Sequence, residues 1–405
     1  MSFFNEKAQK WVEGRKGLMD QICQQFQTQT APIIWMHCAS MGEFEQGRPL
    51  LEAIKQQHPN YQVFLSFFSP SGYEVCKNYE GANYVSYLPM DGAKNAKRFF
   101  DAVKPSLIIF VKYEFWHYYS IEANKRNIPI LLVSGIFRKE QLFFQWYGNF
   151  YRNILRQFSY LFVQDLGSAK LLEGIGLANK TAVCGDTRFD RVISIAEAHE
   201  PIDLVADFCK DHQTIIAGST WSEDDAELNH FINTHPTLRC IVAPHEIIPE
   251  RLNQCLKCYH HSMLYSDYEM AINEQLPLAN DLQVLIINNY GMLTKLYQYA
   301  HICLVGGGFG GDGVHNVLEA AVYGKPVVIG PVYDKYLEAE ELVNNGGCIS
   351  VENALELEEV LNELLDDSND TYRIAAEMAK TYVYQKAGAT KSILDHIEAK
   401  RLLTN

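Results

Sequence analysis

The chain has 405 residues, 47% of them hydrophobic and 21% charged, which is the composition of a folded globular protein. This length exceeds one ordinary hydrophobic core, so two or three domains are expected. A formal net charge of −14 disfavours a general nucleic-acid binder, and no nucleic acid is expected as a partner. No apolar run reaches the roughly 18–20 residues of a transmembrane helix, and ten scattered cysteines fit a reducing cytoplasm.

Short apolar runs alternate with amphipathic segments of helical length, and this pattern predicts parallel α/β structure. The predicted strands are 33–37, 61–67, 84–87, 107–111, 130–133, 160–163 and 182–184, then 214–217, 239–243, 284–286, 302–305, 326–329 and 348–350. The alternation breaks between residues 186 and 212. We therefore expect two Rossmann-like domains, 1–205 and 206–385, facing each other across a deep cleft. A C-terminal helix within 386–405 is expected to pack back on the first domain.

A carboxylate follows the first predicted strand, in the sequence Ser40-Met-Gly-Glu43. The spacing fits a capping box, in which Glu43 only satisfies backbone donors at a helix start. The same position, at a strand-to-helix turn, is also where α/β enzymes place catalytic groups. Glu114 directly follows the run 107–111 and has the same two interpretations, a group at the site or a surface carboxylate.

Six glycines within 306–313 separate a predicted strand from a helix that is expected to start near Asn316. Glycines let backbone N–H groups approach a ligand, and a helix N-terminus favours negative charge, so this loop predicts a phosphate site. Glu319, one turn later, could reach a ribose hydroxyl. A flexible loop and an ordinary surface glutamate are the alternatives. The literal match to G-x-G-x-x-G is weak as a dinucleotide fingerprint, because a glycine-rich run matches by chance and this one lies in the second half of the chain.

Two further strand-to-helix turns in the second half carry small or polar residues, at Ser219-Thr220 and at Pro244-His245. Together with the glycine-rich loop they predict one nucleotide-shaped site. No G-x-S-x-G, H-E-x-x-H or P-loop motif occurs, so acyl hydrolysis, zinc hydrolysis and P-loop chemistry fit poorly.

Several of these segments together resemble one known family. They are 35–43 with Arg48, 87–91, 114–116, 184–190, 217–220, 313–319 and 324–326. The chain resembles the bacterial 3-deoxy-D-manno-octulosonic acid (Kdo) transferases of lipopolysaccharide synthesis, which have the GT-B glycosyltransferase fold.

The resemblance implies an inverting transfer of Kdo from CMP-Kdo to the lipid A precursor, without a metal or a cofactor. It implies that Glu43 is the general base on the acceptor hydroxyl and that Glu114 is a second catalytic glutamate. A carboxylate within reach of a hydroxyl can take its proton, and the adjoining helix start is expected to keep Glu43 ionised. The implied donor-binding residues are Ser219, Thr220, Pro244, His245, Gly313, His315, Asn316 and Glu319.

A phosphorylated lipid acceptor needs basic and apolar surface on the first domain. The tentative acceptor-binding residues are Ser40, Gly42, Arg48, Lys97, Arg98, Arg138 and Lys139, with the aromatic run 143–147 beside them. The expected location is the cytoplasmic face of the inner membrane, as a peripheral protein, with the family's N-terminal anchor absent or trimmed.

The sequence departs from the family pattern at two donor positions. The family's P-R-H-P is Pro244-His245-Glu246 here, without the arginine, and valine stands at 314 where the family has a second glycine. Other functions stay open: a GT-B transferase or epimerase that uses a UDP-sugar, a dinucleotide-dependent oxidoreductase, or a nucleotide-binding protein in which Glu43 is only a cap.

Overall fold

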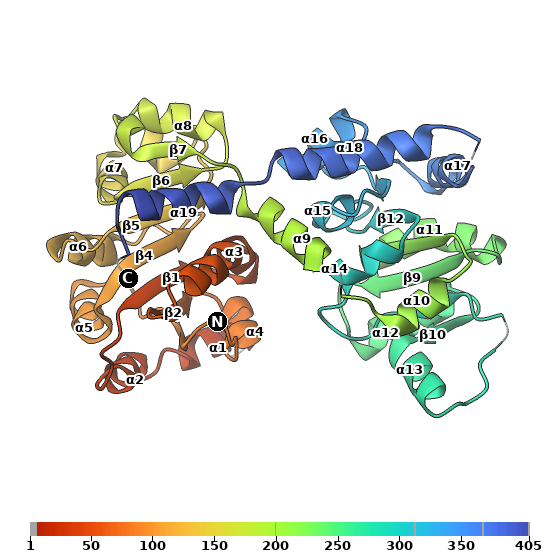
Figure 1. Ribbon diagram of the computed structural model, residues 1–405, viewed down its shortest axis with the longest axis horizontal. Coiled ribbons are helices and arrows are strands. Elements are labelled where there is room, and N and C mark those ends of the chain that lie inside the picture. Colours follow the sequence, from red (N-terminus) through yellow and green to blue (C-terminus); the bar gives the residue numbers. More distant parts are fainter. Residues whose placement is uncertain (1–5, 199, 280, 312, 367, 404–405) are drawn as a thin grey trace. The chain divides into compact units, whose positions relative to one another are not determined.

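The computed structural model describes residues 6–198, 200–279, 281–311, 313–366 and 368–403. The chain divides into two compact units (Figure 1). The first unit comprises residues up to Arg191 and those from Ala387 onward, and the second comprises Val192–Lys386. The division falls inside helix α9 (Thr187–Ala198), whereas the sequence predicted a boundary at 205/206.

The first unit is built on a parallel sheet with the strand order β3-β2-β1-β4-β5-β6-β7. This is a Rossmann-like order, in which the direction of winding reverses between β1 and β4. The loops after these two strands therefore leave the same edge of the sheet side by side, and His37 pairs with Phe110 in the register. The strands are β1 Ile33–Cys38, β2 Gln62–Phe67, β3 Tyr84–Tyr87, β4 Pro105–Val111, β5 Ile130–Gly135, β6 Tyr160–Val163 and β7 Thr181–Val183.

The second unit has a parallel sheet with the order β10-β11-β9-β8-β12-β13-β14, which reverses between β8 and β12. Its strands are β8 Thr214–Thr220, β9 Arg239–Pro244, β10 Ser262–Leu264, β11 Val284–Ile286, β12 Ile302–Val305, β13 Val327–Ile329 and β14 Cys348–Ser350. Strand β10 was not predicted from the sequence, since it has only three half-buried residues at the sheet edge and no hydrophobic pattern.

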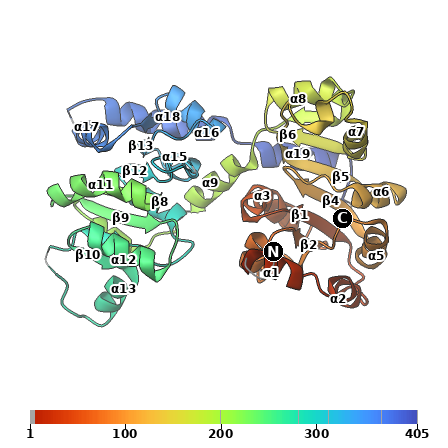
Figure 2. The same cartoon turned by 180° about the vertical axis from the view of Figure 1, so that it is seen from behind.

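Helices cover both faces of each sheet (Figure 2). In the first unit they are α1 Glu6–Glu13, α2 Leu18–Gln25, α3 Met41–Gln57, α4 Pro70–Cys76, α5 Ala93–Val103, α6 His117–Lys125, η1 Leu142–Phe144, α7 Asn149–Arg156, α8 Leu166–Glu173, η2 Ala178–Lys180 and α19 Ala389–Ala399. In the second unit they are α10 Asp203–Cys209, α11 Ser222–Thr234, α12 Pro249–Cys258, α13 Tyr265–Asn273, α14 Leu293–Leu296, η3 Tyr297–Tyr299, α15 Leu318–Ala321, α16 Leu337–Asn344, α17 Ala354–Leu365 and α18 Thr371–Gln385.

Strand β1 shows why the strands are continuous apolar runs in the sequence: both faces of the sheet are buried. Trp35 lies in the core on one face of the sheet, whereas Ile34 and Met36 lie in the core on the other face. Helix α19 closes this second core with the buried side chains of Ile393 and Ile397. Burial of such a side chain contributes about 1.5–3 kcal/mol, so α19 is held firmly to the first unit.

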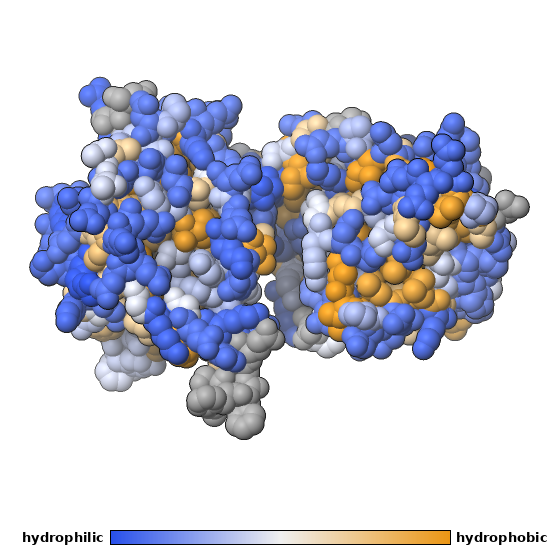
Figure 3. All heavy atoms as spheres, turned by 90° about the horizontal axis from the view of Figure 1, so that it is seen from below, coloured by the Kyte–Doolittle hydropathy of each residue, from blue (hydrophilic) through white to orange (hydrophobic). Residues whose placement is uncertain are grey.

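The surface differs between the units. In the view of Figure 3 apolar side chains gather on the second unit, in the right half of the picture, whereas the first unit is mainly polar on this face. On the first unit, exposed aromatic side chains occur around α7, where Trp146 is 89% exposed. Among the helices that lie within the described residues, none has both the length and the apolar character needed to cross a membrane.

Candidate active site

A buried polar network lies at the ends of β1 and β4 in the first unit. Ser66 Oγ accepts a hydrogen bond from Trp35 Nε1 at 2.7 Å and lies 2.8 Å from His37 Nδ1. An indole N–H can only donate, so the Ser66 hydroxyl hydrogen is available to His37 Nδ1. His37 Nε2 then faces Glu114 Oε2 at 2.7 Å, although the ring N–H is not aligned with that oxygen. Glu114 Oε2 accepts a hydrogen bond from Trp116 Nε1 at 2.7 Å, and this bond fixes the carboxylate in place.

Glu43 lies beside this network, in the first turn of α3. Its Oε2 accepts a short hydrogen bond from the backbone N–H of Ala39. Burial, and then the negative charge of Glu114, raise the pKa of Glu43 from its ordinary 4.5 to about 7, against the opposing effects of the Ala39 N–H and of Lys112. Glu43 is therefore a carboxyl group that exchanges its proton near neutral pH.

This geometry corrects two expectations for Glu43. The Ser40 side chain makes no capping hydrogen bond, and Glu43 binds the N–H of Ala39 rather than that of Ser40, so the reciprocal capping box does not form. The helix start was expected to lower the pKa of Glu43 and keep it ionised. This expectation is wrong, because burial and the like charge of Glu114 raise that pKa.

Arg48, predicted as an acceptor contact, takes part in an ion-pair network. Its Nε lies 2.7 Å from Glu52 Oε1 and its Nη1 lies 3.4 Å from Glu45 Oε1. Arg191 of α9 binds the same two carboxylates, at 3.3 Å to Glu45 and 3.6 Å to Glu52. The network joins α3 to the start of α9, which gives Arg48 a structural task in the first unit.

Lys97 and Arg98 lie on the surface of α5. Lys97 Nζ is 2.7 Å from Asp101, and Arg98 Nη2 is 2.5 Å from Asp20 of α2. Both are exposed ion pairs, which contribute little to stability and separate easily in favour of another anion.

The remaining predicted acceptor residues of the first unit are accessible. Gly42 is exposed and Ser40 is half-buried at the start of α3. Arg138 and Lys139 are exposed in the segment after β5. This segment leads into η1 and α7, where the exposed aromatic side chains occur.

In the second unit Asp224 joins two loops. Its Oδ2 accepts from the backbone N–H groups of Trp221 at 2.7 Å and Gly307 at 2.8 Å, and its Oδ1 accepts from Phe309 at 3.4 Å. Asp224 is fully buried, and burial raises its pKa against these three hydrogen bonds. The glycine-rich loop was expected to offer its N–H groups to a phosphate, but two of them are bound to this carboxylate.

Two glycines of the loop are also needed for close packing. A Cβ atom on Gly308 would lie 2.6 Å from the backbone nitrogen of Gly330, which follows β13. Gly313 has φ 91°, and a Cβ there would lie 2.8 Å from the ring of Tyr336. At these two glycines the loop is packed closely against its neighbours.

Three aromatic rings meet at the ends of β8, β9 and β12. The rings of His245 and His315 are stacked with centroids 4.3 Å apart and planes 10° apart. The ring of Trp221 lies 4.6 Å from that of His245, and Trp221 Nε1 donates to His315 Nε2 at 3.0 Å. His245 follows the buried Pro244 and is itself exposed. The predicted donor residues His245 and His315 are therefore brought together, and Trp221 joins them.

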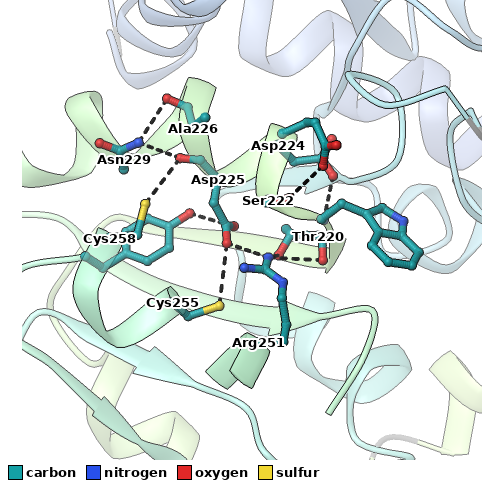
Figure 4. A network of polar contacts seen from close by, with 12 residues as sticks. Thr220, Ser222, Asp224, Asp225, Ala226, Asn229, Arg251, Cys255 and Cys258 are labelled. Carbon is teal, nitrogen blue, oxygen red and sulfur yellow. Dashed lines mark hydrogen bonds and ion pairs between the residues drawn. The ribbon is translucent and has the colours of Figure 1, made fainter. Parts of the chain in front are cut away.

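Thr220 has a structural role next to this ring group (Figure 4). Arg251 Nη2 donates to its carbonyl and hydroxyl oxygens at 3.3 Å, and the same guanidinium pairs with Asp225 Oδ2 at 2.5 Å. Tyr259 Oη donates to Asp225 Oδ1 at 2.9 Å. Thr220 is buried, whereas its neighbour Ser219 is half-buried with φ 55°. Of these two predicted donor residues, only Ser219 is open to a ligand.

Asn316 and Glu319 are joined by a hydrogen bond, from Asn316 Nδ2 to Glu319 Oε1 at 2.9 Å. Asn316 Oδ1 accepts from the N–H of Leu318, the first residue of α15, at 3.2 Å. The helix begins at Leu318 and has only four residues, whereas the sequence predicted a helix from about Asn316. One turn has a small dipole, so the expected attraction of this helix for phosphate is weak.

Four residues that organise these sites were not predicted. His37 and Ser66 lie inside apolar strands, and only the pairing of β1 with β2 brings them opposite each other. Asp224 and Trp221 follow β8, but nothing in their spacing shows that they reach the loop after β12. Within the described residues, no group of three or more His, Cys, Asp and Glu side chains could hold a metal ion.

Known proteins resemble this chain in sequence and in fold. A family model described as 3-deoxy-D-manno-octulosonic-acid transferase (kdotransferase) matches residues 11–191. The 3-deoxy-D-manno-octulosonic acid transferase of Aquifex aeolicus is 27% identical over 339 residues, 82% of this chain and 86% of that protein. The Haemophilus influenzae protein of the same name is 26% identical over 373 residues, 89% of this chain and 86% of its own.

Among solved structures, a UDP-GlcNAc 2-epimerase from Neisseria meningitidis bound to UDP-GlcNAc has the same fold, with a TM-score of 0.63 and 16% identity. The match covers 91% of this chain and all of the epimerase chain (100%). This likeness is one of fold, whereas the likeness in sequence is to the Kdo transferases. The resemblance predicted from the sequence is confirmed: the chain is similar in sequence to bacterial Kdo transferases, and its two parallel sheets are those of the GT-B fold.

Proposed function

We propose that the chain transfers Kdo from CMP-Kdo to a phosphorylated lipid A precursor, with inversion at the anomeric carbon. The Kdo transferases to which it is similar support this proposal. The observation that carries it is the state of Glu43, whose pKa of about 7 is that of a general base matched to neutral pH. The resemblance also implies that the reaction needs no metal and no cofactor.

In the proposed reaction the first unit supplies the base. Glu43 Oε2 is bound to the N–H of Ala39, and Oε1 takes the proton from the acceptor hydroxyl. The hydroxyl oxygen forms a bond to the anomeric carbon of Kdo as the bond from that carbon to the CMP phosphate oxygen breaks. The electron pair leaves with CMP, and the proton stays on Glu43 until solvent removes it. Glu114, held by His37 and Trp116, keeps the pKa of Glu43 high enough for this step.

The second unit binds the donor in this proposal. The accessible residues after the strands of this unit are Ser219, His245, His315, Asn316 and Glu319. The other predicted donor residues, Thr220, Pro244 and Gly313, are buried beside them. His245 takes the place of the family's missing arginine, because its ring stacks on His315 and both imidazoles can offer N–H groups to an anion.

We further propose peripheral binding to the cytoplasmic face of the inner membrane through one surface of the first unit. Arg138 and Lys139 would attract anionic head groups, while Trp146 and Phe150, 89% and 52% exposed, would enter the interface. Tyr147, 57% exposed, suits the same layer because its ring is amphipathic.

Titration of the protein with CMP, UDP and NADH tests the proposal, together with an assay of Kdo transfer from CMP-Kdo to a tetra-acylated lipid A precursor. We expect CMP to bind at least tenfold more tightly than UDP, and transfer to persist in EDTA. Preferential binding of UDP would favour a UDP-sugar transferase or an epimerase. Tight NADH binding without CMP binding would favour an oxidoreductase, and nucleotide binding without transfer would leave a binding protein.

A further inference from the structure

An arginine without an acidic partner lies at the carboxyl edge of the sheet in the first unit. We propose that this residue, Arg15, determines acceptor specificity in the proposed reaction: with the hydroxyl groups of Ser69 and Ser71 it binds a phosphate group of the acceptor. Arg15 lies between α1 and α2, and the two serines lie where the chain passes from β2 into α4. The inference rests on the proposed function for the identity of the ligand, and on the contacts of Arg15 for the site itself.

The Arg15 guanidinium is held in place by carbonyl oxygens and by aromatic rings. Its Nε donates to the carbonyl of Leu88 at 3.2 Å, its Nη1 to that of Trp11 at 3.2 Å and its Nη2 to that of Phe68 at 2.7 Å. Its Cζ atom lies 4.2 Å from the centroid of the Trp11 ring, 5.0 Å from that of Phe68 and 4.9 Å from that of Tyr87. The group is therefore fixed over the ends of β2 and β3 by neutral partners alone.

The positive charge of Arg15 is not balanced by a carboxylate. Among the residues that the structure describes, no Asp or Glu side chain forms an ion pair with Arg15. By contrast, Arg126 of the same unit pairs with Asp101 at 2.5 Å and with Glu122 at 2.6 Å. Burial lowers the pKa of Arg15 to about 10, so the group is desolvated but stays charged at neutral pH. A charge in this state attracts an anion.

The guanidinium also keeps hydrogen-bond donors for a ligand. A guanidinium has five N–H hydrogens. Three of them are used on carbonyl groups, which leaves one on Nη1 and one on Nη2 of Arg15. Arg15 is half-buried rather than enclosed. A planar guanidinium with two hydrogens left matches the oxygens of a phosphate.

Two hydroxyl groups lie next to this cation. Phe68, whose carbonyl binds Arg15 Nη2, is followed directly by Ser69, and Ser69 Oγ lies 2.8 Å from Ser71 Oγ. One hydroxyl hydrogen joins the two oxygens, so the other can be donated to a ligand. Ser69 is half-buried and Ser71 is exposed, so both are within reach of a ligand.

The site adjoins the proposed base. The backbone N–H of Ser69 donates to the carbonyl of Ala39 at 2.8 Å, and the N–H of Ala39 is bound to Glu43. On the other side, the ring of Phe68 lies 5.5 Å from that of Trp116, which donates to the second carboxylate. An acceptor held by its phosphate at this cation therefore has its sugar hydroxyls close to both carboxylates.

The kinetic test uses two acceptors that differ only in phosphate, the tetra-acylated lipid A precursor and its dephosphorylated form. We expect Arg15→Gln to raise the KM for the phosphorylated acceptor about tenfold or more, the scale of a charge-assisted contact, with kcat and the KM for CMP-Kdo kept. Its transfer to the dephosphorylated acceptor should equal that of wild type. Arg126→Gln, which replaces an arginine that has acidic partners, is the matched control and should behave as wild type with both acceptors.

Nitrogen-15 NMR of arginine-labelled protein reads the site without a substrate. The Nε–H signal of Arg15, identified by its absence in Arg15→Lys, is titrated with inorganic phosphate and, at equal ionic strength, with chloride. Phosphate should shift this signal to saturation and chloride should not. The signal of Arg126, identified by its absence in Arg126→Gln, should stay in place in both titrations.

An equal rise of the KM for both acceptors in Arg15→Gln would show a structural role and overturns the inference, as does a rise of the KM for CMP-Kdo alone. Reduced sedimentation of Arg15→Gln with anionic phospholipid vesicles, at an unchanged acceptor KM, would assign the cation to membrane lipid and also overturns it. An Arg15 signal that phosphate leaves in place has the same consequence.

Two further outcomes keep the test decisive. If Arg15→Gln does not fold, Ser71→Ala on the surface takes its place, with a rise of about threefold expected in the KM for the phosphorylated acceptor alone; equal values for both acceptors contradict the site. If wild type transfers no Kdo, the proposed function fails, and the phosphate titration of Arg15 still decides whether this site binds phosphate.

Discussion

The carboxylate of Glu114 lies 2.7 Å from Nε2 of His37, a histidine with no exposed surface at the end of β1. The contact, with the hydrogen bond from Trp116, fixes a negative charge beside Glu43. In the proposed reaction Glu114 would act through the pKa of Glu43, which its charge raises.

Glu114→Gln should lower the pKa of Glu43, because it removes the like charge that raises it. In a plot of the Kdo transfer rate at saturating donor against pH, the wild-type rate should rise near pH 7, and the rate of Glu114→Gln should rise at a lower pH. Glutamine can still accept the Trp116 hydrogen bond, so folding should be kept. A pH–rate profile with an unmoved acidic limb would show that Glu114 does not set the pKa of Glu43.

Glu43→Gln should lose Kdo transfer by about 100-fold or more, the scale of a lost general base, while CMP affinity stays at the wild-type value. The amide keeps the hydrogen bond from Ala39 but cannot take a proton. Glu45→Gln, two positions along α3, is the control and should transfer nearly normally. Near-normal transfer by Glu43→Gln would instead assign Glu43 to the helix start alone.

The stability of Glu43→Gln should separate the two interpretations without any substrate. The pKa of Glu43 in the folded chain, about 7, lies above its ordinary 4.5, so folding favours the protonated form. This contribution to stability is complete below pH 4.5 and is lost as the pH rises through 7. The neutral amide avoids that loss.

Thermal unfolding should thus show Glu43→Gln melting roughly 2–5 °C above wild type at pH 8.5 and close to wild type at pH 5. A cap with a lowered pKa gives the opposite sign, with the variant less stable at high pH. The comparison needs only circular dichroism at two pH values.

The fold could be predicted because it depends on local patterns. Continuous apolar runs such as the one containing Trp35 and Met36 mark strands buried on both faces, and thirteen of these runs were identified from the sequence alone. Glu43 and Glu114 were singled out from the sequence because each lies just beyond such a strand, and their catalytic roles stay predictions. Strand β10 was not, since three half-buried residues carry no periodic signal.

The connections within the sites could not be predicted, because they join residues far apart in the chain. The pKa of Glu43 depends on Glu114, and the place of Glu114 depends on His37. Asp224 occupies N–H groups of the glycine-rich loop, although it lies 83 positions before Gly307. Spacing in the sequence does not encode such contacts, whereas the strand order creates them.

The exposed aromatic surface of the first unit gives a prediction about membranes. Trp146→Ser combined with Tyr147→Ser should reduce sedimentation with vesicles of anionic phospholipid by about tenfold or more, because each ring buries apolar area in the interface. CMP affinity should not change. Tyr290→Ser is the control, since Tyr290 of the second unit is 79% exposed outside this surface. Equal loss in the control would contradict a specific surface.

Asp224→Asn should weaken the second unit and its nucleotide site together. Wild-type Asp224 accepts three backbone N–H groups while fully buried. Asparagine has one acceptor oxygen, and its NH₂ group would face an N–H donor, so at least one buried N–H is left without a partner at a cost of about 1–3 kcal/mol. The released loops carry Trp221 and the glycines that precede His315.

We therefore expect Asp224→Asn to lower the free energy of unfolding of the second unit by that amount and to weaken CMP binding by more than the loss of stability explains at 25 °C. Glu223→Gln, the exposed neighbour on the same turn of α11, is the matched control and should do neither. Urea denaturation and CMP titration on both variants measure the two effects. A stability loss without a loss of CMP affinity would show that the rings of Trp221, His245 and His315 stay in place without Asp224, and that the loop and the ring group are held independently.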